Sequence, residues 1–218
     1  MMLKKFYKKY GYFILIAYLI AAFFYPPLGV IAVICMVAPI IFAFAGMGRY
    51  WCGNFCPRGN FYQNAAAKIS SDRPIPAFLK SWWFRTFIVL FIIGNFSRGV
   101  YKNWGSLAGI GMVFYRIIVI TTLVGILLAL FFKPRTWCSF CPMGTLAALT
   151  AKLRGRKISI QVANTCVSCG LCSKKCPMEL SPKDAAGGNV ASNDCIFCQE
   201  CVYACPKDAV SLHSSADV

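Results

Sequence analysis

The sequence predicts an α-helical membrane protein with four transmembrane helices, arranged as two repeated hairpins and followed by a small α+β domain. Hydrophobic residues make up 58% of the 218 residues and the mean hydropathy is +0.60, which is too apolar for a soluble domain. Four long apolar runs lie before residue 133, whereas eight of the thirteen cysteines lie after residue 165. The charge divides at the same place, because residues 1–165 hold 19 Lys and Arg with one acid, and residues 166–218 hold four Lys with six acids.

The apolar runs account for the helical part of the chain. They cover residues 11–25, 28–45, 82–101 and 108–132. Each run is close to the roughly 20 residues that a membrane-spanning helix needs, and backbone polar groups in lipid must be satisfied within the protein. Pro26 and Pro27 separate the first two runs, so we expect these runs to form one hairpin and the last two to form a second.

The placement of Lys and Arg predicts how the hairpins are oriented in the membrane. Fifteen basic residues lie within residues 1–10, 46–81 and 133–157, and only Arg98 and Lys102 lie on the other side. Because basic residues are retained on the cytoplasmic side, we expect a multi-pass protein of the cytoplasmic (inner) membrane with both termini in the cytoplasm. Anionic lipid and an acidic redox partner explain the basic clusters, so we do not expect nucleic acid as a partner.

The segment after residue 157 predicts a second domain, residues 158–218, and leaves residues 1–157 as the membrane domain. Residues 157–163 and 209–213 alternate apolar and polar side chains, as strands do. The eight cysteines between them form two runs, Cys166-x2-Cys169-x2-Cys172-x3-Cys176-Pro and Cys195-x2-Cys198-x2-Cys201-x3-Cys205-Pro. This is the spacing of bacterial ferredoxins with two clusters, in which the fourth cysteine of each run binds the other cluster.

We therefore expect two [4Fe-4S] clusters in a small ferredoxin-like α+β domain. Three closely spaced thiolates wrap three irons, and a thiolate from the other run reaches the fourth iron. The first cluster is assigned to Cys166, Cys169, Cys172 and Cys205. The second is assigned to Cys195, Cys198, Cys201 and Cys176. Zinc would use two-plus-two ligand spacing, and disulfides are disfavoured in the cytoplasm.

A different cysteine motif occurs twice, each time directly after a hairpin. The copies read R-x-W-C-x3-C-P-x-G from Arg49 and R-x-W-C-x2-C-P-x-G from Arg135. A parallel repeat of hairpin, turn and short helix would bring four thiols to one point at the cytoplasmic end of the bundle. These thiols are Cys52, Cys56, Cys138 and Cys141.

The combination resembles a family of membrane-bound 4Fe-4S ferredoxin-type proteins with cytoplasmic Cys-x3-Cys-Pro motifs. The family includes the membrane iron–sulfur subunit of periplasmic nitrate reductase systems, the nitrous oxide reductase regulator and a copper-reducing assembly factor of oxidases. The resemblance covers nearly the whole chain and implies electron transfer between the cytoplasmic side or the quinone pool and an extracytoplasmic acceptor. Cys52 and Cys56 match the family motif, whereas Cys138 and Cys141 have one residue fewer between them.

Three kinds of site fit the four thiols of the membrane domain. One is a third [4Fe-4S] cluster, whose negative charge Arg49, Arg58 and Arg135 would offset. Another is a redox-active thiol pair or a transient copper site, because soft thiolates favour Cu(I). The third is structural zinc, for which the paired spacing is acceptable.

We interpret the protein as a membrane-bound iron–sulfur electron carrier, the electron-transfer subunit of an oxidoreductase complex, and assign no catalytic residue. Electrons would pass between a soluble cytoplasmic donor or acceptor and a quinone or a membrane or extracytoplasmic redox subunit. The alternatives are a thiol- or cluster-dependent copper reductase and a factor that assembles the metal site of another complex. The apolar runs contain no Asp, Glu or His to take the protons of a quinol, which favours a quinone site in a partner subunit.

Four other residues have simpler interpretations. Cys35 lies within an apolar run, where a lone cysteine is most often a small buried hydrophobe. Trp51 and Trp137 are interpreted as anchors at the membrane interface. Arg85 lies near the cytoplasmic end of its run and is interpreted as a side chain that extends to the interface.

Overall fold

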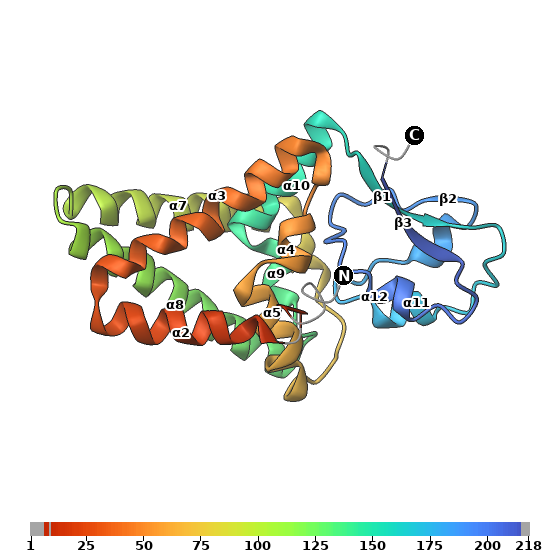
Figure 1. The fold of residues 1–218 in the computed structure, drawn as a ribbon, viewed down its shortest axis with the longest axis horizontal. Helices are drawn as coiled ribbons and strands as arrows, with labels where there is room; N and C mark the ends of the chain where they lie inside the picture. The colour runs from red at the N-terminus through yellow and green to blue at the C-terminus, as the bar shows by residue number, and fades with distance from the viewer. Residues whose placement is uncertain (1–6, 9, 215–218) are drawn as a thin grey trace.

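The computed structural model describes residues 7, 8 and 10–214 and consists of a helical bundle beside a small sheet domain (Figure 1). Lys4, Lys5 and Lys9, which contribute to the predicted orientation, lie outside the described residues. The helical part contains α2 (Tyr12–Phe24), η1 (Pro26–Ala32), α3 (Val33–Phe42), η2 (Ala43–Met47), α4 (Tyr50–Asn54), α5 (Pro57–Asn64), η3 (Ala66–Lys68), α6 (Ala77–Lys80), α7 (Trp82–Lys102), α8 (Leu107–Phe131), α9 (Thr136–Phe140) and α10 (Pro142–Arg154). The sheet domain contains β1 (Ile158–Val162), α11 (Leu171–Lys175), η4 (Pro182–Ala185), β2 (Gly188–Asn189), α12 (Glu200–Tyr203) and β3 (Val210–Ser214).

All four apolar runs are helical and extend away from the sheet domain as two hairpins (Figure 1). Two segments are long and apolar enough to cross a membrane, Pro26–Met47 and Leu107–Phe131. Helix α2 is short at 13 residues, and α7 carries Arg85, Arg98 and Lys102, which lower its hydropathy. Of the four predicted transmembrane helices, length and composition therefore support two, the second and the fourth in chain order.

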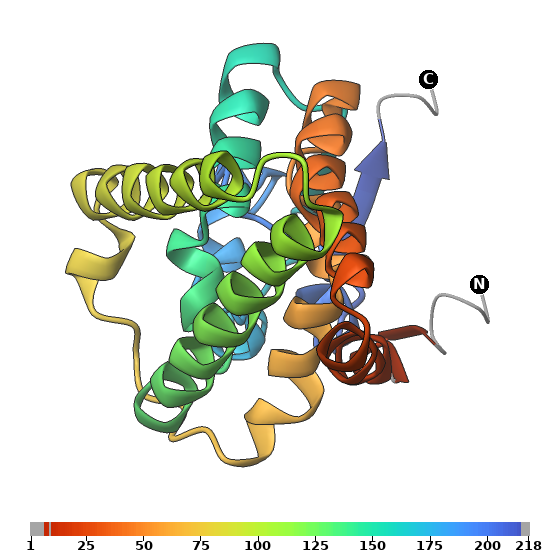
Figure 2. The same cartoon turned by 90° about the vertical axis from the view of Figure 1, so that its left-hand side faces the viewer.

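Close packing of η1 against α8 joins the two hairpins. Gly29 of η1 and Gly111 of α8 lie against each other's helix so tightly that a Cβ atom at Gly111 would overlap the carbonyl oxygen of Pro26. The Pro26-Pro27 pair begins η1, because proline has a helical φ and its missing N–H is not needed in a first turn. Figure 2 shows α8 between α7 on one side and α2 and α3 on the other.

Each hairpin ends in a turn that carries one copy of the repeated motif. Cys56 caps α5, whose first residue is Pro57, and Cys141 precedes Pro142, the first residue of α10. Proline is favoured at the first helical position, so each Cys-Pro pair places its cysteine at a helix N-terminus. The backbone N–H of Gly59 donates to Cys56 Sγ at 3.4 Å.

The sheet domain forms around the two predicted strands. β1 and β3 pair antiparallel with Val162 opposite Val210, and β2 on the other edge gives the order β2-β1-β3. The inward side chains of β1 pack with Val190, Phe197 and Val210 in the core of the domain. Several cysteines pack against this core, and so do Met47 and Tyr50 of the helical part, so the core continues across the boundary between the domains.

Candidate metal centres

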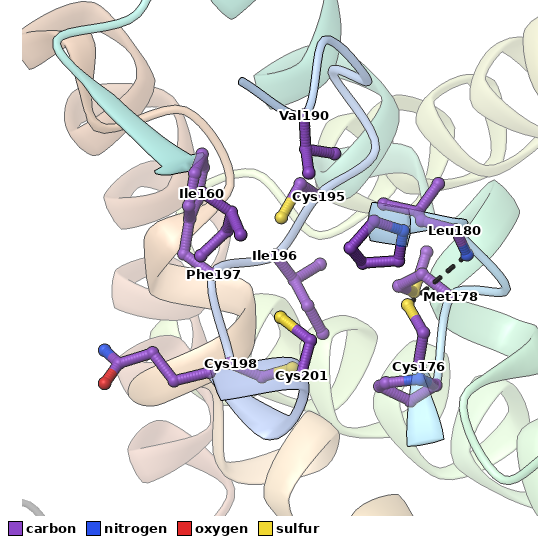
Figure 3. Close-up of a pocket in the computed structure, with 13 residues that line it drawn as sticks. Ile160, Cys176, Met178, Leu180, Val190, Cys195, Ile196, Phe197, Cys198 and Cys201 are labelled. Carbon is purple, nitrogen blue, oxygen red and sulfur yellow. Dashed lines mark hydrogen bonds between the residues drawn. The ribbon is translucent and has the colours of Figure 1, made fainter. Parts of the chain in front are cut away.

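Four of the predicted cluster ligands surround a pocket that we term the inner pocket. It is lined by Cys176, Cys195, Cys198 and Cys201, the same four that the spacing assigns to one cluster. Figure 3 shows Cys176 on one side and the first three cysteines of the second run on the other. The backbone N–H of Leu180 donates to Cys176 Sγ at 3.3 Å.

The other four predicted ligands line the outer pocket, at the far side of the sheet domain. They are Cys166, Cys169, Cys172 and Cys205. Cys169 is exposed, and so are the apolar side chains of Val167 and Leu171 beside it. A cluster in the outer pocket would therefore lie close to the surface, within reach of a soluble partner.

Each group of four cysteines lines one pocket of the sheet domain. Within residues 7–8 and 10–214, no three His, Cys, Asp or Glu side chains lie close enough together to bind one metal ion. A single zinc ion needs its sulfur ligands at about 2.3 Å from one centre. A four-iron cluster takes one cysteine on each of its four irons, which are spread around the cluster.

Burial determines the chemical state of these thiols. It raises the pKa of Cys195, of Cys201 and of Cys52 in the helical part to about 12. Thiols with such pKa values stay protonated at neutral pH unless a metal ion displaces the proton. Positively charged iron would supply that displacement, so loading of these sites should release protons.

The structure also brings together the four cysteines of the repeated motif, which we term the membrane-motif site. Cys52, Cys56 and Cys141 line one cavity, and Cys138 lies within electrostatic range of all three. The shorter spacing of the second pair is accommodated because α9 runs directly into Cys141. In the first pair, Phe55 lies between the end of α4 and Cys56.

The two copies of the motif are locked together by reciprocal hydrogen bonds. Arg49 of the first copy donates from Nη2 to the carbonyl oxygen of Cys138 at 2.6 Å, and Arg135 of the second donates from Nη1 to that of Cys52 at 3.0 Å. Each guanidinium group lies against the glycine that ends the opposite copy. These glycines are Gly144 for Arg49 and Gly59 for Arg135. The Arg at the start of each copy therefore contacts the Gly at the end of the other copy, and this contact accounts for both positions of the motif.

Buried hydrogen-bond donors surround the membrane-motif site. Arg58 Nη2 lies 3.6 Å from Cys141 Sγ. Arg49 Nε and the Nε1 atoms of Trp51 and Trp137 are buried without an acceptor among the residues that the structure describes. The sulfur atoms of a bound cluster would accept hydrogen bonds from such donors. The interpretation of Trp137 as an interfacial anchor is wrong, because its side chain is only 5% exposed in the core.

An ion triad of two buried arginines and one partly exposed aspartate holds the sheet domain against the membrane motif. Asp194 accepts hydrogen bonds from Arg85 at 2.8 and 2.9 Å and from Arg49 at 3.1 Å. Arg49 is 1% exposed and Arg85 7% exposed. Burial alone would raise the pKa of Asp194, but the two guanidinium groups outweigh it and hold that pKa below its usual value. The position of Arg85 in the sequence suggested a side chain that extends to the membrane interface. That interpretation is wrong, because Arg85 is buried and paired with Asp194.

The turn of the first motif touches the inner pocket directly. Gly53, between Cys52 and Cys56, lies so close to the carbonyl oxygen of Ile196 that a Cβ atom would overlap it. The next residue, Asn54, donates from Nδ2 to the carbonyl oxygen of Phe197 at 3.1 Å. Ile196 and Phe197 are part of the inner-pocket loop between Cys195 and Cys198. Helix α4 of the first motif and the loop from Cys195 to Cys198 are thus in backbone contact, and this contact joins the membrane-motif site to the inner pocket.

Comparisons with known proteins agree with the chemistry of these sites. The family model of a 4Fe-4S binding domain matches residues 28–76 and 115–161, and each matched segment contains one copy of the repeated motif. The model of a 4Fe-4S dicluster domain matches residues 165–210. The chain is thus similar to 4Fe-4S binding domains in both of its parts.

Three curated relatives are similar to the chain. Two uncharacterized proteins of Methanocaldococcus jannaschii are each 26% identical, over 83% and 76% of this chain and 70% and 72% of their own lengths. The protein YccM of Escherichia coli, named as an electron transport protein, is 34% identical over 43% of this chain and 26% of its own length. No solved structure matches the chain significantly. The domain matches and this relative support iron–sulfur electron transfer as the function.

Proposed function

We propose that the protein is a membrane-bound electron carrier in which three [4Fe-4S] sites form a relay. The relay runs from the outer pocket through the inner pocket to the membrane-motif site. The observation that carries this proposal is the backbone contact of Gly53 with Ile196, which joins the last two sites. When bound, the clusters supply one-electron redox chemistry. The exposed outer pocket is the side that a soluble cytoplasmic partner would meet.

The protein's own residues would hold the membrane-motif cluster and balance its charge. Cys52, Cys56, Cys138 and Cys141 are its proposed ligands. Arg49 and Arg135 each hydrogen-bond the backbone of a ligand from the opposite copy, and Arg58 lies against Cys141 Sγ. Three guanidinium groups in a largely buried site balance the negative charge of four cysteinates around a bound metal group.

The surface of the helical bundle supports its placement in a membrane. Large apolar side chains are exposed along all four long helices, among them Phe24, Ile41, Phe87, Leu90 and Leu127. A soluble protein rarely exposes apolar surface on this scale, whereas lipid requires it. We therefore propose that all four apolar segments span the membrane, and not only the two that are long and apolar enough by themselves. The sheet domain then lies on the cytoplasmic side.

Iron quantification tests the relay. Three four-iron clusters predict about twelve irons per chain after anaerobic purification. Cys56→Ser should lower the content to about eight, because it removes a ligand of the membrane-motif site only. Cys35→Ser is the matched control, since Cys35 lies in the same cavity but outside the motif, and it should retain about twelve. About eight irons per chain in the wild type, with the same number in Cys56→Ser, would rule out the third cluster. Bound copper in that protein would favour the metal-reductase alternative.

Reporter fusions test the orientation. Alkaline phosphatase folds only where disulfides form, outside the cytoplasm. We expect phosphatase activity from a fusion after Asn103, in the turn between α7 and α8, and none from a fusion after Lys152 near the end of α10. Phosphatase activity from the fusion after Lys152 but not from the fusion after Asn103 would reverse the proposed topology. The fifteen basic residues within residues 1–10, 46–81 and 133–157 would then lie outside the cytoplasm and would need another explanation.

A further inference from the structure

Arg116 lies inside the apolar length of helix α8, one of the two segments that are long and apolar enough to cross a membrane. It is nine positions from Leu107, where α8 begins, and fifteen from Phe131, where it ends. Nine positions correspond to roughly 14 Å along a helix, in a hydrocarbon layer about 30 Å thick. A charged side chain at such a depth is costly in lipid, so it usually faces the interior of a bundle and has a partner there.

The side chain of Arg116 instead lies on the outside of the bundle. It is exposed, and so are the apolar side chains that follow it along the same face of α8, which are Ile120, Leu123 and Leu127. Within residues 7, 8 and 10–214, no hydrogen bond or ion pair joins Arg116 to another residue. This face is therefore apolar around a single charge, and hydrocarbon alone would leave that charge without a counterion.

A second polar side chain, Asn95 of α7, lies at the same level of the bundle. Helices α7 and α8 are antiparallel neighbours (Figure 1), and Gly99 packs so tightly on Val113 that an added Cβ atom would lie 2.8 Å from its Cγ1. Asn95 precedes Gly99 by one turn and Arg116 follows Val113 by one turn, so both continue this contact toward the sheet domain. Asn95 is also exposed. The two polar side chains thus lie on one side of the α7–α8 pair.

Extension of the Arg116 side chain toward the membrane interface would lower its cost but does not account for Asn95. A long arginine can place its charge nearer the interface. The side chain of Asn95 is too short for that. Among the described residues it has one hydrogen-bond partner, the carbonyl oxygen of Phe91, to which Nδ2 donates at 2.8 Å. Two polar side chains at one level of an apolar surface indicate a polar contact with another helix in the membrane.

We propose that this face of α7 and α8 is the docking surface for a transmembrane helix of another subunit, and that a carboxylate on that helix pairs with Arg116. The inference rests on the proposed function, because it requires the membrane placement of the bundle and names the kind of partner that the carrier would meet there. A carboxylate accepts hydrogen bonds from the planar guanidinium in a bidentate geometry. Asn95 would donate to the same helix with the remaining N–H of its amide.

The partner helix would come from a different protein and not from a second copy of this chain. The four apolar runs of this chain contain no Asp or Glu, so a second copy could not supply the carboxylate within the membrane. Two copies that met through this face would also bring two arginines together in a medium of low dielectric, where like charges repel strongly. The charge of Arg116 thus selects an acidic membrane subunit.

Association with a designed transmembrane peptide tests the proposal. The probes are a leucine-rich helix with one glutamate at its middle and the same helix with glutamine there. Each is measured by fluorescence energy transfer to the iron-loaded full-length protein in phosphatidylcholine vesicles. We expect the wild type to bind the glutamate peptide about fivefold or more tightly than the glutamine peptide. Arg116→Leu should abolish this preference, whereas Arg116→Lys keeps the charge and should retain it. Arg98→Leu is the matched control, because Arg98 is also exposed but lies only four positions from the end of α7, and it should bind like the wild type.

The outcomes separate the docking surface from the proposed function. Equal affinities of the wild type for the two peptides, or a preference that Arg116→Leu retains, would overturn the docking surface and leave the relay and its membrane placement standing. Energy transfer between two labelled copies of the protein that Arg116→Leu abolishes would assign the face to a second copy and would also overturn it. Release of the protein from the vesicles by alkaline carbonate would overturn the membrane placement, and the docking surface with it.

Discussion

Asp194→Asn is expected to release the sheet domain from the membrane motif. The substitution keeps the size of the side chain but removes the only carboxylate that the described residues place between Arg49 and Arg85. Arg85 is then buried without a counterion and Arg49 keeps only the charge of the membrane-motif site, and breaking a buried ion pair in this way costs about 3–5 kcal/mol. The ratio of docked to undocked molecules should fall by roughly 100-fold or more.

Tryptic cleavage after Arg156 measures this loss. Arg156 lies in the connection between α10 and β1, and while the domains are docked it donates to the carbonyl oxygens of Ser192 and Ala191 at 2.7 and 2.9 Å. Cleavage of a protected site follows the population of the open form, so it should accelerate by a similar factor in Asp194→Asn. Asp184→Asn removes an exposed acid of the same domain and should leave the rate unchanged. Equal rates in wild type and both variants would show that the triad does not hold the domains together.

The grouping of the ferredoxin-type cysteines could be predicted from the sequence because it depends on short-range spacing. Three cysteines within seven residues must share one loop, and the fourth cysteine of the run points elsewhere. The structure groups the same four residues around the inner pocket and the same four around the outer pocket. The two longer strands could be predicted for a similar reason, since their alternating pattern is local.

The docking of the domains could not be predicted because its contacts join distant residues. Arg85 and Asp194 are 109 positions apart, and each has a common explanation when taken alone. An arginine near a helix end usually extends to the interface, and an acid in a loop is usually solvated. Cys35 likewise has a common explanation when taken alone, and only the structure places it along the cavity beside Cys56.

The membrane motif lies deeper in the bundle than its position in the sequence suggests. Each copy follows the end of a hairpin, which predicts a site below the last turn of the helices. In the structure, Arg58 and Tyr62 both bond to Thr121, ten residues before the end of α8, or roughly 15 Å from it. Gly125 makes this possible, because a Cβ atom there would overlap the hydroxyl of Tyr62.

Gly53→Ala is expected to weaken the contact between the membrane-motif site and the inner pocket without unfolding either domain. Gly53 lies in α4 and does not have a positive φ, so alanine is compatible with its backbone and is intrinsically favoured there by about 1 kcal/mol. The new methyl group would overlap the carbonyl oxygen of Ile196, which is a backbone atom and cannot rotate away. Overpacking of this kind costs about 1–3 kcal/mol, so the docked state should be disfavoured by roughly 5- to 150-fold.

Hydrogen exchange of the loop from Cys195 to Cys201, combined with iron quantification, measures the effect. We expect faster exchange of this loop in Gly53→Ala and slower electron transfer from the sheet domain, with the iron content of the wild type. Gly94→Ala is the matched control, because Gly94 lies in α7 with nothing within 4 Å of an added Cβ atom. An unchanged iron content together with slower electron transfer would show that both sites are intact and that the distance between them has increased. Cys56→Ser cannot give this result, because it removes one of the two sites. Wild-type exchange and transfer in Gly53→Ala would mean that electrons do not pass through this contact, and the order of sites in the relay would then be wrong.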